Sequence, residues 1–593
     1  MFEFLRSDPL FRLDYNSTKE SQRQITRARA YALVKAGFVS ADPLGLPAGE
    51  REHHRQYADA LSFHDNSINT LLGAQFTLFA GSIARLGSDH HLQHFLPHAA
   101  SLSLRGCFAL TELGHGSNVR GIETTATFDP VRDEFVINTP TETAQKYWIG
   151  GGAEWAQIAT VFAQLYIGTV HYGVHAFLVP LRDQADHRPL PGVRIRDCGH
   201  KMGLNGVDNG RFWFDHVRVP RTNLLDRFGG VSRDGEYNSF IANNDLRFAV
   251  TMGNLLTGRV ALSRGSTNLC KIALATALRY ASTRRQFGGP PGGPEVPIIN
   301  YTTHQVRLLP LLATTYAFDF MSRKAWLLFE EAQANTDLDA IKRVHVLVSG
   351  LKALSTWHMT QTIQTCREAC GGQGYKSSNR IGIIKADGDI QLTYEGDNAV
   401  LLQQVSKDLV KTALSVPPAQ LRDDLELRRR VDGVYLHSGD AQLRSFRLHE
   451  AILIHRLKTE YEAAKASGLQ GDDALETCAT LATDAGRAHI ERIVFEEFLR
   501  AEKEAPSSLS PALSLLRSLF AISRFDTSPS FLREQHFTVE KQRAVHKAMV
   551  GLCAELRDLA TTLVDGFDIP PFLLGDIAGD WVLKNSFASE DSP

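Results

Sequence analysis

The strongest constraint on the fold is a change in the spacing of apolar residues along the chain. From Thr18 to Phe38 and from Asn69 to Leu86 they recur every three or four residues, which predicts helices with one buried face. Between Gly106 and Pro220 the chain changes to short runs of valine, isoleucine, threonine and aromatic residues, which are typical of strands. Helical spacing returns after Leu225. This order predicts an α+β protein that is mainly α.

The length of 593 residues corresponds to about four domains of ordinary size. We expect an N-terminal helical domain (1–102), a central β-barrel-like domain (103–225), a four-helix bundle (226–416) and an additional C-terminal helical domain (417–593). The long helices of the bundle are predicted over 240–285, 303–333, 338–370 and 397–414. Val416-Pro-Pro418 ends that pattern. Further helices are predicted over 441–467, 472–503 and 538–565.

The charge balance excludes a strongly basic protein whose main partner is nucleic acid. Lys and Arg number 64 against 66 Asp and Glu, a net charge of −2. No apolar stretch approaches the roughly 20 residues that span a bilayer, so no membrane partner is expected. Seven cysteines, an odd number, suit a reducing compartment. The last residues, Ser-Glu-Asp-Ser-Pro, carry no Ser-Lys-Leu address, and we expect a cytoplasmic location.

Three clusters of potential ligand residues are interpreted as structural. His90, His94 and His98 have a spacing that places three imidazoles on one helix face, but no HExxH motif accompanies them. Cys366 and Cys370 lack the partners of a zinc site, so no metal is expected. Arg428-Arg-Arg430 lies beside Asp423, Asp424 and Glu426, which favours a solvated face.

Two glycine-containing segments of the β region have the composition of a ligand site. In Ala109-Leu-Thr-Glu-Leu-Gly-His-Gly-Ser-Asn118 a strand runs into a loop with two glycines and two hydroxyl groups, suited to phosphate or ring oxygens. Lys146-Tyr-Trp-Ile-Gly-Gly-Gly152 suits a flat ring lying against the backbone. A polar turn and a flexible connection are the alternative interpretations.

Three further segments lie at the ends of the predicted bundle helices. Arg284-Arg-Gln-Phe-Gly288 offers arginine to a phosphate, or is a solvated helix end. Cys370-Gly-Gly-Gln-Gly-Tyr375 is a glycine cluster that also fits a helix C-cap. In Thr393-Tyr-Glu-Gly-Asp-Asn398, Glu395 precedes a predicted N-cap at Asp397, and Gly396 lets a substrate pass close by. A glutamate favouring a helix N-terminus is the alternative.

Together and in this order, the five segments resemble the acyl-CoA dehydrogenase and oxidase superfamily of flavoproteins. The resemblance covers roughly residues 20 to 415. The additional helical domain is similar to that of the longer acyl-CoA oxidases, and TELGHGSNVRGIETTATFDP and TYEGDN look particularly like the oxidases.

The resemblance implies FAD bound between the β domain and the bundle, in a homodimer or larger assembly. Thr111 would bind the pyrimidine edge of the flavin, and Gly150 and Gly151 would lie beside the ring. Arg284 and the Gly371-Gly372 turn match positions that hold the pyrophosphate and adenine end. Ser117 matches a position near CoA, Arg259 one close to the base, and Glu395 the catalytic base itself.

The activity implied is α,β-dehydrogenation of an acyl-CoA thioester, a step of fatty acid β-oxidation. Glu395 would remove the α-proton while hydride leaves the β-carbon for the flavin, giving a trans-2-enoyl-CoA. Burial should raise its pKa toward the working pH. Many dehydrogenases have Trp-Ile-Thr-Asn where this chain has Trp148-Ile-Gly-Gly151, and the missing side chain opens room for dioxygen. We therefore expect an oxidase that produces H2O2.

Three alternatives remain at this stage. In the first alternative, the protein is an acyl-CoA dehydrogenase whose reduced flavin passes its electrons to an electron-transfer flavoprotein. Some members of the fold bind DNA through a basic helical domain, but here the C-terminal segment carries both signs of charge. A relative without a working base is the third, and the Glu395 carboxylate weighs against it.

Overall fold

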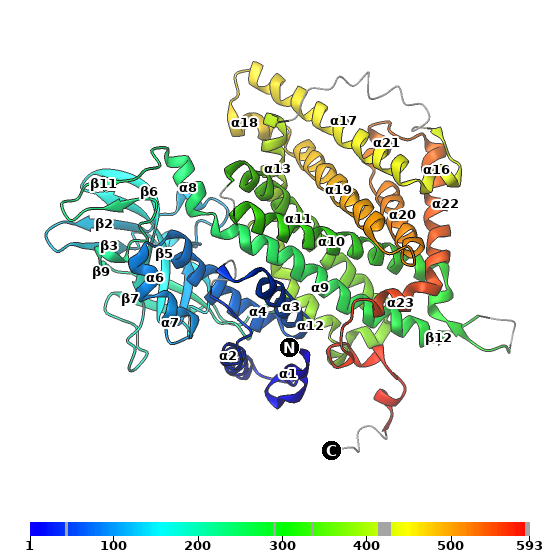
Figure 1. Ribbon diagram of the computed structural model, residues 1–593, viewed down its shortest axis with the longest axis horizontal. Coiled ribbons are helices and arrows are strands. Elements are labelled where there is room, and N and C mark those ends of the chain that lie inside the picture. The colour runs from blue at the N-terminus through cyan, green and yellow to red at the C-terminus, as the bar shows by residue number, and fades with distance from the viewer. Residues whose placement is uncertain (42–44, 289–291, 335–336, 413–428, 588–593) are drawn as a thin grey trace. The chain divides into compact units, whose positions relative to one another are not determined.

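The computed structural model describes residues 1–41, 45–288, 292–334, 337–412 and 429–587 (Figure 1). The chain divides into two compact units, Met1–Gly258 and Arg259–Pro593. Helices dominate, and the longer strands all belong to the first unit, which confirms the predicted mainly α, α+β class. The division into four domains stays a prediction. Its boundary at 416/417, Val416-Pro-Pro418 and Arg428 lie outside the described residues; Arg430 is described and pairs with Asp432.

The first unit begins with helices and returns to helix at its end. Its helices are α1 (Phe2–Ser7), α2 (Lys19–Lys35), α3 (Ala48–His64), α4 (Asn66–Leu72), α5 (Gly81–Leu86), α6 (Asp89–His94), α7 (Leu96–Ala100) and α8 (Asn244–Thr251). A π-helical stretch, Gly73–Ala80, joins α4 to α5. The predicted helices over 18–38 and 69–86 are therefore present, and α3 was not singled out.

The spacing of the three histidines does not place their imidazoles on one helix. α6 ends at His94 and α7 begins at Leu96, so His98 lies on a different helix from His90 and His94. Pro97 lies in the first turn of α7, and proline has no backbone N–H to continue the hydrogen bonds of the preceding helix. His98 Nδ1 instead lies 3.1 Å from Ser103 Oγ.

The β region contains a six-stranded and a three-stranded sheet. The larger has the order β1-β5-β2-β3-β9, with β6 on the other side of β5, and the smaller has the order β4-β8-β7. The strands are β1 (Gly106–Ala109), β2 (Thr125–Asp129), β3 (Glu134–Asn138), β4 (Lys146–Gly150), β5 (Ile158–Ile167), β6 (Val170–Pro180), β7 (Val193–Asp197), β8 (Asn209–Phe214), β9 (Val217–Pro220), β10 (Gly230–Val231) and β11 (Tyr237–Asn238).

Strand β5 organises the larger sheet and determines where the first candidate loop emerges. Its first half pairs with β1 and its second half with β2, both in parallel, while β6 pairs along the other edge. The chain leaves β1 at Ala109 and rejoins β5 through β2 at Thr125, so residues 110–124 form a loop at this edge. Gln164 of β5 secures the loop by donating to the carbonyls of Arg120 and Ile122, each at 2.9 Å.

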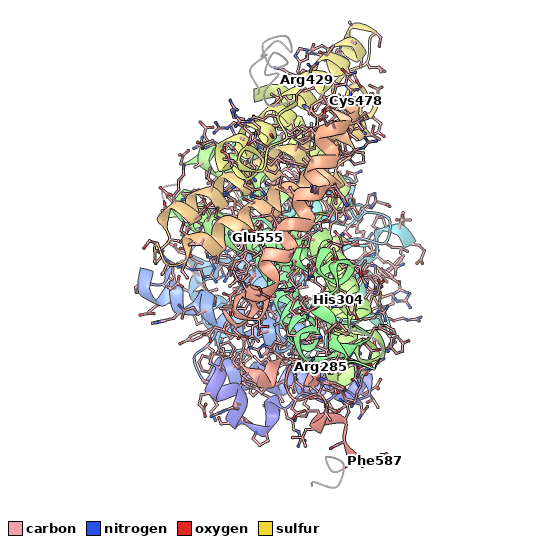
Figure 2. All side chains as sticks on the ribbon, turned by 90° about the vertical axis from the view of Figure 1, so that its right-hand side faces the viewer. Arg285, His304, Arg429, Cys478, Glu555 and Phe587 are labelled. Atoms are coloured by element: carbon pink, nitrogen blue, oxygen red, sulfur yellow. The ribbon has the colours of Figure 1, made fainter. Side chains whose placement is uncertain are left out.

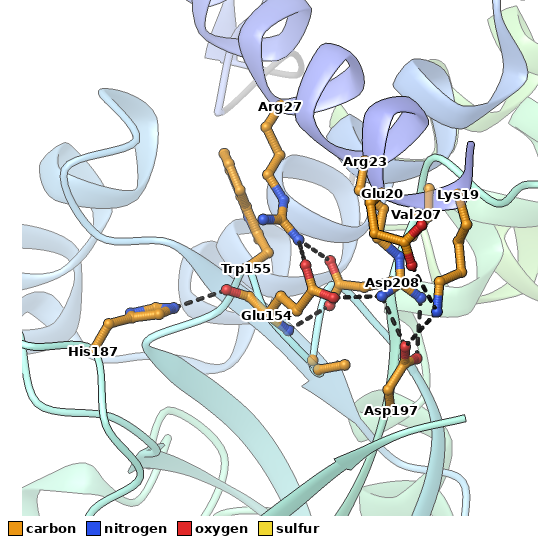
Figure 3. A network of polar contacts seen from close by, with 12 residues as sticks. Lys19, Glu20, Arg23, Arg27, Glu154, Trp155, His187, Asp197, Val207 and Asp208 are labelled. Carbon is orange, nitrogen blue, oxygen red and sulfur yellow. Dashed lines mark hydrogen bonds and ion pairs between the residues drawn. The ribbon is translucent and has the colours of Figure 1, made fainter. Parts of the chain in front are cut away.

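A polar network connects α2 to the loop that follows β4 (Figure 3). The buried Arg23 guanidinium donates to both oxygens of Asp197, at 2.8 and 3.0 Å. Arg27 donates to Asp208 at 3.2 Å and to Glu154 at 2.5 Å. The Asp208 carboxylate accepts from the Glu154 N–H, and the backbone carbonyl of Asp208 accepts from the Gly151 N–H at 2.7 Å. The network therefore holds the glycine loop after β4 in place.

The second unit is almost entirely helical. α9 (Asn254–Thr283) begins in the first unit and continues into the second, where a short β12 (Arg285–Gln286) and β13 (Val296–Pro297) pair follows it. The other helices are α10 (Thr302–Ala334), α11 (Leu338–Ala369), α12 (Ile381–Asp389), α13 (Asn398–Thr412), α16 (Gly433–His437), α17 (Gly439–Ala466), α18 (Gly471–Glu476), α19 (Ala479–Glu504), α20 (Ser510–Thr527), α21 (Ser530–Arg533), α22 (Val539–Leu556) and α23 (Ala560–Asp565).

Helices of the predicted bundle and of the later segment share one core in this unit. α10 packs on α11, α11 on α13, and α19 on α10 and α13 (Figure 1). A Cβ at Gly350 of α11 would lie 2.3 Å from Ile490 of α19, so only glycine permits this close helix crossing. Figure 2 shows α22, which carries Glu555, crossing the same unit.

Three predicted helices are interrupted. The stretch 240–285 divides into α8 and α9 at Met252 and Gly253, where glycine lowers helix propensity. The stretch 472–503 divides at Thr477 and Cys478, and 538–565 at a 3-10 turn, Arg557–Leu559. α12 and α20 were not predicted. None of the described helices combines the length and the apolar composition needed to cross a membrane.

Candidate active site

The two glycine-containing segments of the first unit lie side by side. The Tyr147 N–H of β4 donates to the carbonyl oxygen of Thr111 at 2.9 Å, and the Leu113 N–H donates to the carbonyl of Gln145 at 2.9 Å. These bonds bring Thr111 next to the strand that leads to Gly150 and Gly151. Three of the residues that the sequence assigned to flavin binding are thus placed together.

A buried ion pair lies directly beneath this pair of segments. Lys146 Nζ is fully buried and donates to the Glu112 carboxylate at 2.9 Å and to the Leu110 carbonyl at 3.1 Å. The N–H groups of Glu123 and Thr124 and the Thr124 hydroxyl also donate to Glu112. Burial opposes ionisation of Glu112, but Lys146 and these donors outweigh it and lower the pKa of the carboxyl.

Glu112 also belongs to a group of side chains with metal-ligand atoms. Single ligand atoms of Glu112, His115 and Glu123 lie within 4.8 Å of one another. Because the Glu112 oxygens already accept from Lys146 and two backbone N–H groups, we interpret the cluster as the anchor of the 110–124 loop.

Glycines occupy the last position of β4 and the position after it. Gly150 pairs with Asn209 of β8, and a Cβ at Gly150 would meet only the Ala74 side chain, at 3.9 Å. Gly151 has a φ of +71°, which an L side chain rarely adopts. Ser117 lies apart from these residues, on the exposed outer part of the 110–124 loop, where its carbonyl accepts from Val119 N–H.

In the second unit, Glu395 lies on the short loop before α13 in a strained conformation. Its φ is +55°, in the left-handed region. The residue is partly exposed, but its Oε2 atom is buried and has no hydrogen-bond partner among the described residues. Burial raises the pKa of this carboxyl to about 7, and the charges of Arg259 and Lys352 limit the rise.

Two buried cations hold the consecutive backbone carbonyls of Glu395 and Gly396. Arg259 Nε of α9 donates to the Glu395 carbonyl at 3.0 Å, and a second guanidinium nitrogen donates to Ser349 Oγ at 3.1 Å. Lys352 Nζ of α11 donates to the Gly396 carbonyl at 2.7 Å and to Asn398 Oδ1 at 3.0 Å. Both cations contact the loop rather than the carboxylate, which leaves that group available.

The start of α13 fixes the other end of the loop. Asp397 Oδ1 accepts from the Ala399 N–H at 2.9 Å, which is the predicted N-cap. Gly396 has a φ of +109°, and a Cβ there would lie 2.9 Å from Leu401. The structure therefore brings Glu395, Gly396 and Arg259 together.

Arg284 and the glycine turn lie elsewhere in the same unit. α9 ends at Thr283, and among the described residues the Arg284 guanidinium forms no ion pair; it lies 4.8 Å from the centre of the Trp581 ring. α11 ends at Ala369 and is followed by the turn Gly371–Tyr375. A Cβ at Gly371 or Gly372 would meet no atom within 4 Å, so this backbone is open to a ligand.

Sequence reasoning missed Lys352, Asn398 and the Glu112–Lys146 pair. Lys352 stands within an apolar helical segment beside small polar residues, and a lone lysine in such a stripe is a signal for a buried charge. Glu112 and Lys146 carry no such signal, because neither stands in the apolar stripe of a predicted helix.

The first unit has two sheets, and the second has helices with a carboxyl group on the loop between two of them. The family models that match these regions name the class of protein. Residues 107–217 match the family described as acyl-CoA dehydrogenase, middle domain. Residues 252–410 match the acyl-CoA oxidase C-alpha1 domain, and residues 440–579 match the family described as acyl-CoA oxidase. The chain belongs to the acyl-CoA oxidase family.

Individual relatives agree with this assignment. Acyl-coenzyme A oxidase 3, peroxisomal, of Arabidopsis thaliana is 40% identical over 97% of this chain and 86% of its own. The crystal structure of acyl-CoA oxidase 1 from Yarrowia lipolytica superimposes with a TM-score of 0.90 at 32% identity, covering 100% of this chain and 90% of its own. Acyl-CoA oxidase-2 of Caenorhabditis elegans, bound with FAD, ascaroside-CoA and ATP, has a TM-score of 0.86 at 27% identity, covering 100% and 90%.

The expectation of a cytoplasmic location is wrong. The Arabidopsis relative and several others are named as peroxisomal enzymes, which points to peroxisomes rather than cytoplasm. The expectation was based on the absence of one sorting signal. Such signals are addresses read by receptors, and the location is not decided by one of them.

Proposed function

We propose that this enzyme oxidises an acyl-CoA to its trans-2-enoyl-CoA with FAD as cofactor, Glu395 as the base and O2 as the final electron acceptor. The observation that carries the proposal is the Glu395 carboxyl, whose Oε2 is buried without a hydrogen-bond partner in the described part of the chain and whose pKa is raised to about 7. An ionised carboxylate with this pKa is matched to removing a proton near neutral pH.

The loop around Glu395 also suits recognition of a thioester. An α-proton becomes acidic enough only when donors stabilise the developing negative charge on the carbonyl oxygen. Within the described residues, no backbone carbonyl accepts from the Glu395 N–H, so this group is available to donate to that oxygen. Gly396, which has no side chain, lets the substrate approach both groups.

The residues assigned to FAD fit that cofactor. The guanidinium group of Arg284 is not neutralised by a carboxylate among the described residues, and the Gly371–Gly372 backbone is open, as an anionic pyrophosphate requires. The Tyr147 N–H donates to the Thr111 carbonyl, and Tyr147 and Gly150 belong to the same strand, β4. Thr111 and Gly150 are therefore close enough in the fold for a flat ring to contact both. Bound FAD would supply the hydride acceptor and the route of electrons to O2.

The remaining roles follow from the resemblance of the sequence motifs to the acyl-CoA dehydrogenase and oxidase superfamily. Gly150 leaves space for dioxygen, Gly151 lies beside the flavin ring, Ser117 contacts CoA, and Arg259 positions the base through the Glu395 carbonyl bond. We propose a homodimer in which Arg284 and the Gly371–Gly372 turn bind the FAD of the neighbouring subunit. The four-domain division, 1–102, 103–225, 226–416 and 417–593, is proposed on the same basis. No observation favours the dehydrogenase or the DNA-binding alternative.

Anaerobic reduction tests the activity. The purified protein should show a flavin spectrum that bleaches when an acyl-CoA of suitable chain length is added, and readmitted air should restore the colour with formation of H2O2. Bleaching with slow reoxidation and no peroxide would contradict the role of O2, and a colourless protein that takes up no FAD would contradict the cofactor.

Glu395→Gln tests the base. The amide preserves shape and cannot accept the α-proton, so the bleaching rate should fall by about 10²- to 10⁴-fold while the flavin spectrum stays intact. Asp397→Asn, which alters the neighbouring cap carboxylate, serves as the control and should retain most activity. Rapid bleaching in Glu395→Gln would remove Glu395 from its role.

A further inference from the structure

The C-terminal segment after α23 is fixed to the second unit. The Gly575 N–H donates to Thr276 Oγ1 of α9 at 3.3 Å, and the Ile577 N–H donates to Asn379 Oδ1 at 3.0 Å. Leu573, Leu574 and Ile577 are buried. The residues that follow, 580–587, are named here the C-terminal strap; Figure 2 labels Phe587 at its end and Arg285, the neighbour of Arg284.

Trp581 of the strap contacts Arg284 in a way that preserves the arginine charge. The guanidinium carbon lies 4.8 Å from the centre of the indole ring, and Tyr280 packs against the same ring at 5.8 Å in an edge arrangement. Arg279, earlier on α9, instead pairs with the Asp565 carboxylate at 2.6 Å. An indole face attracts a guanidinium group without neutralising it. Arg284 is thereby held and remains able to bind an anion.

Asn585 of the strap contacts the second group of residues assigned to FAD. Its Oδ1 accepts from Lys376 Nζ at 3.0 Å and from Gln373 Nε2 at 3.5 Å, and its Nδ2 donates to the Trp581 carbonyl at 2.7 Å. Gln373 lies within the Gly371–Tyr375 turn and Lys376 follows it directly. Among the described residues Lys376, like Arg284, has no carboxylate partner.

We propose that the strap positions the FAD-binding cations: Trp581 orients Arg284, Asn585 orients Lys376, and both cations bind the pyrophosphate of FAD. This makes Lys376 a further FAD-binding residue and makes Trp581 and Asn585 positioning residues. Two cations held by neutral side chains on one short segment keep the positive charge that an anionic ligand needs. The inference depends on the proposed use of FAD.

Release of FAD on dilution of the holoenzyme tests the strap, because free FAD is measured by its fluorescence. Trp581→Leu should raise the Kd of FAD roughly 3- to 10-fold, and Trp581→Phe, which keeps an aromatic face, should stay near the wild-type value. Arg284→Gln should weaken FAD more, and Trp581→Leu added to it should have no further effect, because Trp581 acts through Arg284. Val582→Ala, an exposed neighbour, is the control.

Several outcomes would overturn the proposal. Unchanged FAD release in Trp581→Leu, or additive effects of Trp581→Leu and Arg284→Gln, would show that the indole does not act through the arginine. If Trp581→Leu does not fold, the exposed Asn585→Ala and Lys376→Gln should still each weaken FAD by about 2- to 5-fold, and equal binding would reject the strap. A wild-type protein without FAD would instead reject the proposed function, and the strap with it.

Discussion

Two glutamates of this chain stand in opposite electrostatic environments. Glu112 is buried in the first unit, accepts hydrogen bonds from Lys146, from two backbone N–H groups and from a hydroxyl, and has a lowered pKa. Glu395 of the second unit has an Oε2 that finds no hydrogen-bond partner among the described residues, and its pKa is raised. Burial opposes ionisation in both. The difference is that the donors near Glu112 point at its carboxylate, whereas the cations near Glu395 point at the backbone.

This comparison separates a structural carboxylate from a chemically available one. Full pairing makes Glu112 a fixed charge that holds the 110–124 loop against β4. A carboxyl that lacks partners is costly to bury and is retained only where the surrounding structure enforces it. Perturbed carboxyl groups of the second kind mark functional sites.

Removing the Glu112 charge should have the largest effect on stability. Glu112→Gln leaves the buried Lys146 ammonium without a carboxylate, which costs about 3–5 kcal/mol. The urea midpoint, followed by circular dichroism, should fall accordingly. Glu142→Gln, an exposed glutamate of the same region, is the control. Adding Lys146→Met should restore part of the loss, and a Glu112→Gln variant as stable as wild type would contradict the ion-pair role.

Replacing Gly396 should disturb the loop that carries Glu395. In Gly396→Ala the Cβ lies 2.9 Å from Leu401 at a φ of +109°, and the strain should cost about 1–3 kcal/mol. Activity should fall as well because the loop carries Glu395. Gly382→Ala, on α12 with no atom within 4 Å of the added Cβ, is the matched control. Equal thermal midpoints of the two variants would contradict the strain.

The pH profile tests whether Lys352 limits the rise of the Glu395 pKa. As the base must be ionised, kcat/KM of the wild type should increase with pH through about 7. Lys352→Met removes a cation that lowers the Glu395 pKa, so the rise should move to higher pH and the rate at pH 6 should fall by up to about tenfold.

Two other basic side chains near the Glu395 loop, Arg259 and His345, should not obscure the expected shift of the pH profile. Arg259 keeps its charge, and burial lowers the pKa of His345 to about 4, so it is neutral over this range. Asn398→Ala removes one hydrogen bond of Lys352 but keeps the cation, and should leave the midpoint of the profile unchanged. A profile that is the same in Lys352→Met and wild type would refute the electrostatic role.

The smallest expected effect is on the stability of the protein without cofactor. The Glu395 pKa is about 7 when folded against an ordinary value of 4.5, so the folded state keeps its proton longer and stability falls as pH rises from 4.5 through 7. Between pH 6 and 8 the loss should be about 1 kcal/mol after allowance for partial exposure. Glu395→Gln should lack it; an identical pH dependence of the two melting temperatures would contradict the raised pKa.

Local sequence patterns predicted features formed by neighbouring residues, but they did not predict the long-range contacts. Glu395, Gly396 and the Asp397 cap were predicted because a carboxylate, a glycine and an N-cap stand together in the sequence. Lys352 was missed because it meets Gly396 across 44 residues of sequence. The break between α6 and α7 was missed because helical spacing was given more weight than Pro97.

By itself, the sequence determined the class of fold, the family and the order of the candidate segments, because periodicity and glycine motifs depend on neighbours along the chain. Only the tertiary structure decided that the Glu112 carboxylate is paired while Glu395 Oε2 has no partner among the residues described, since the donors of Glu112 and the cations around Glu395 come from separate elements. It also placed Trp581 over Arg284, where the end of the chain returns to the end of α9. Burial and charge at a site are set by packing between distant segments.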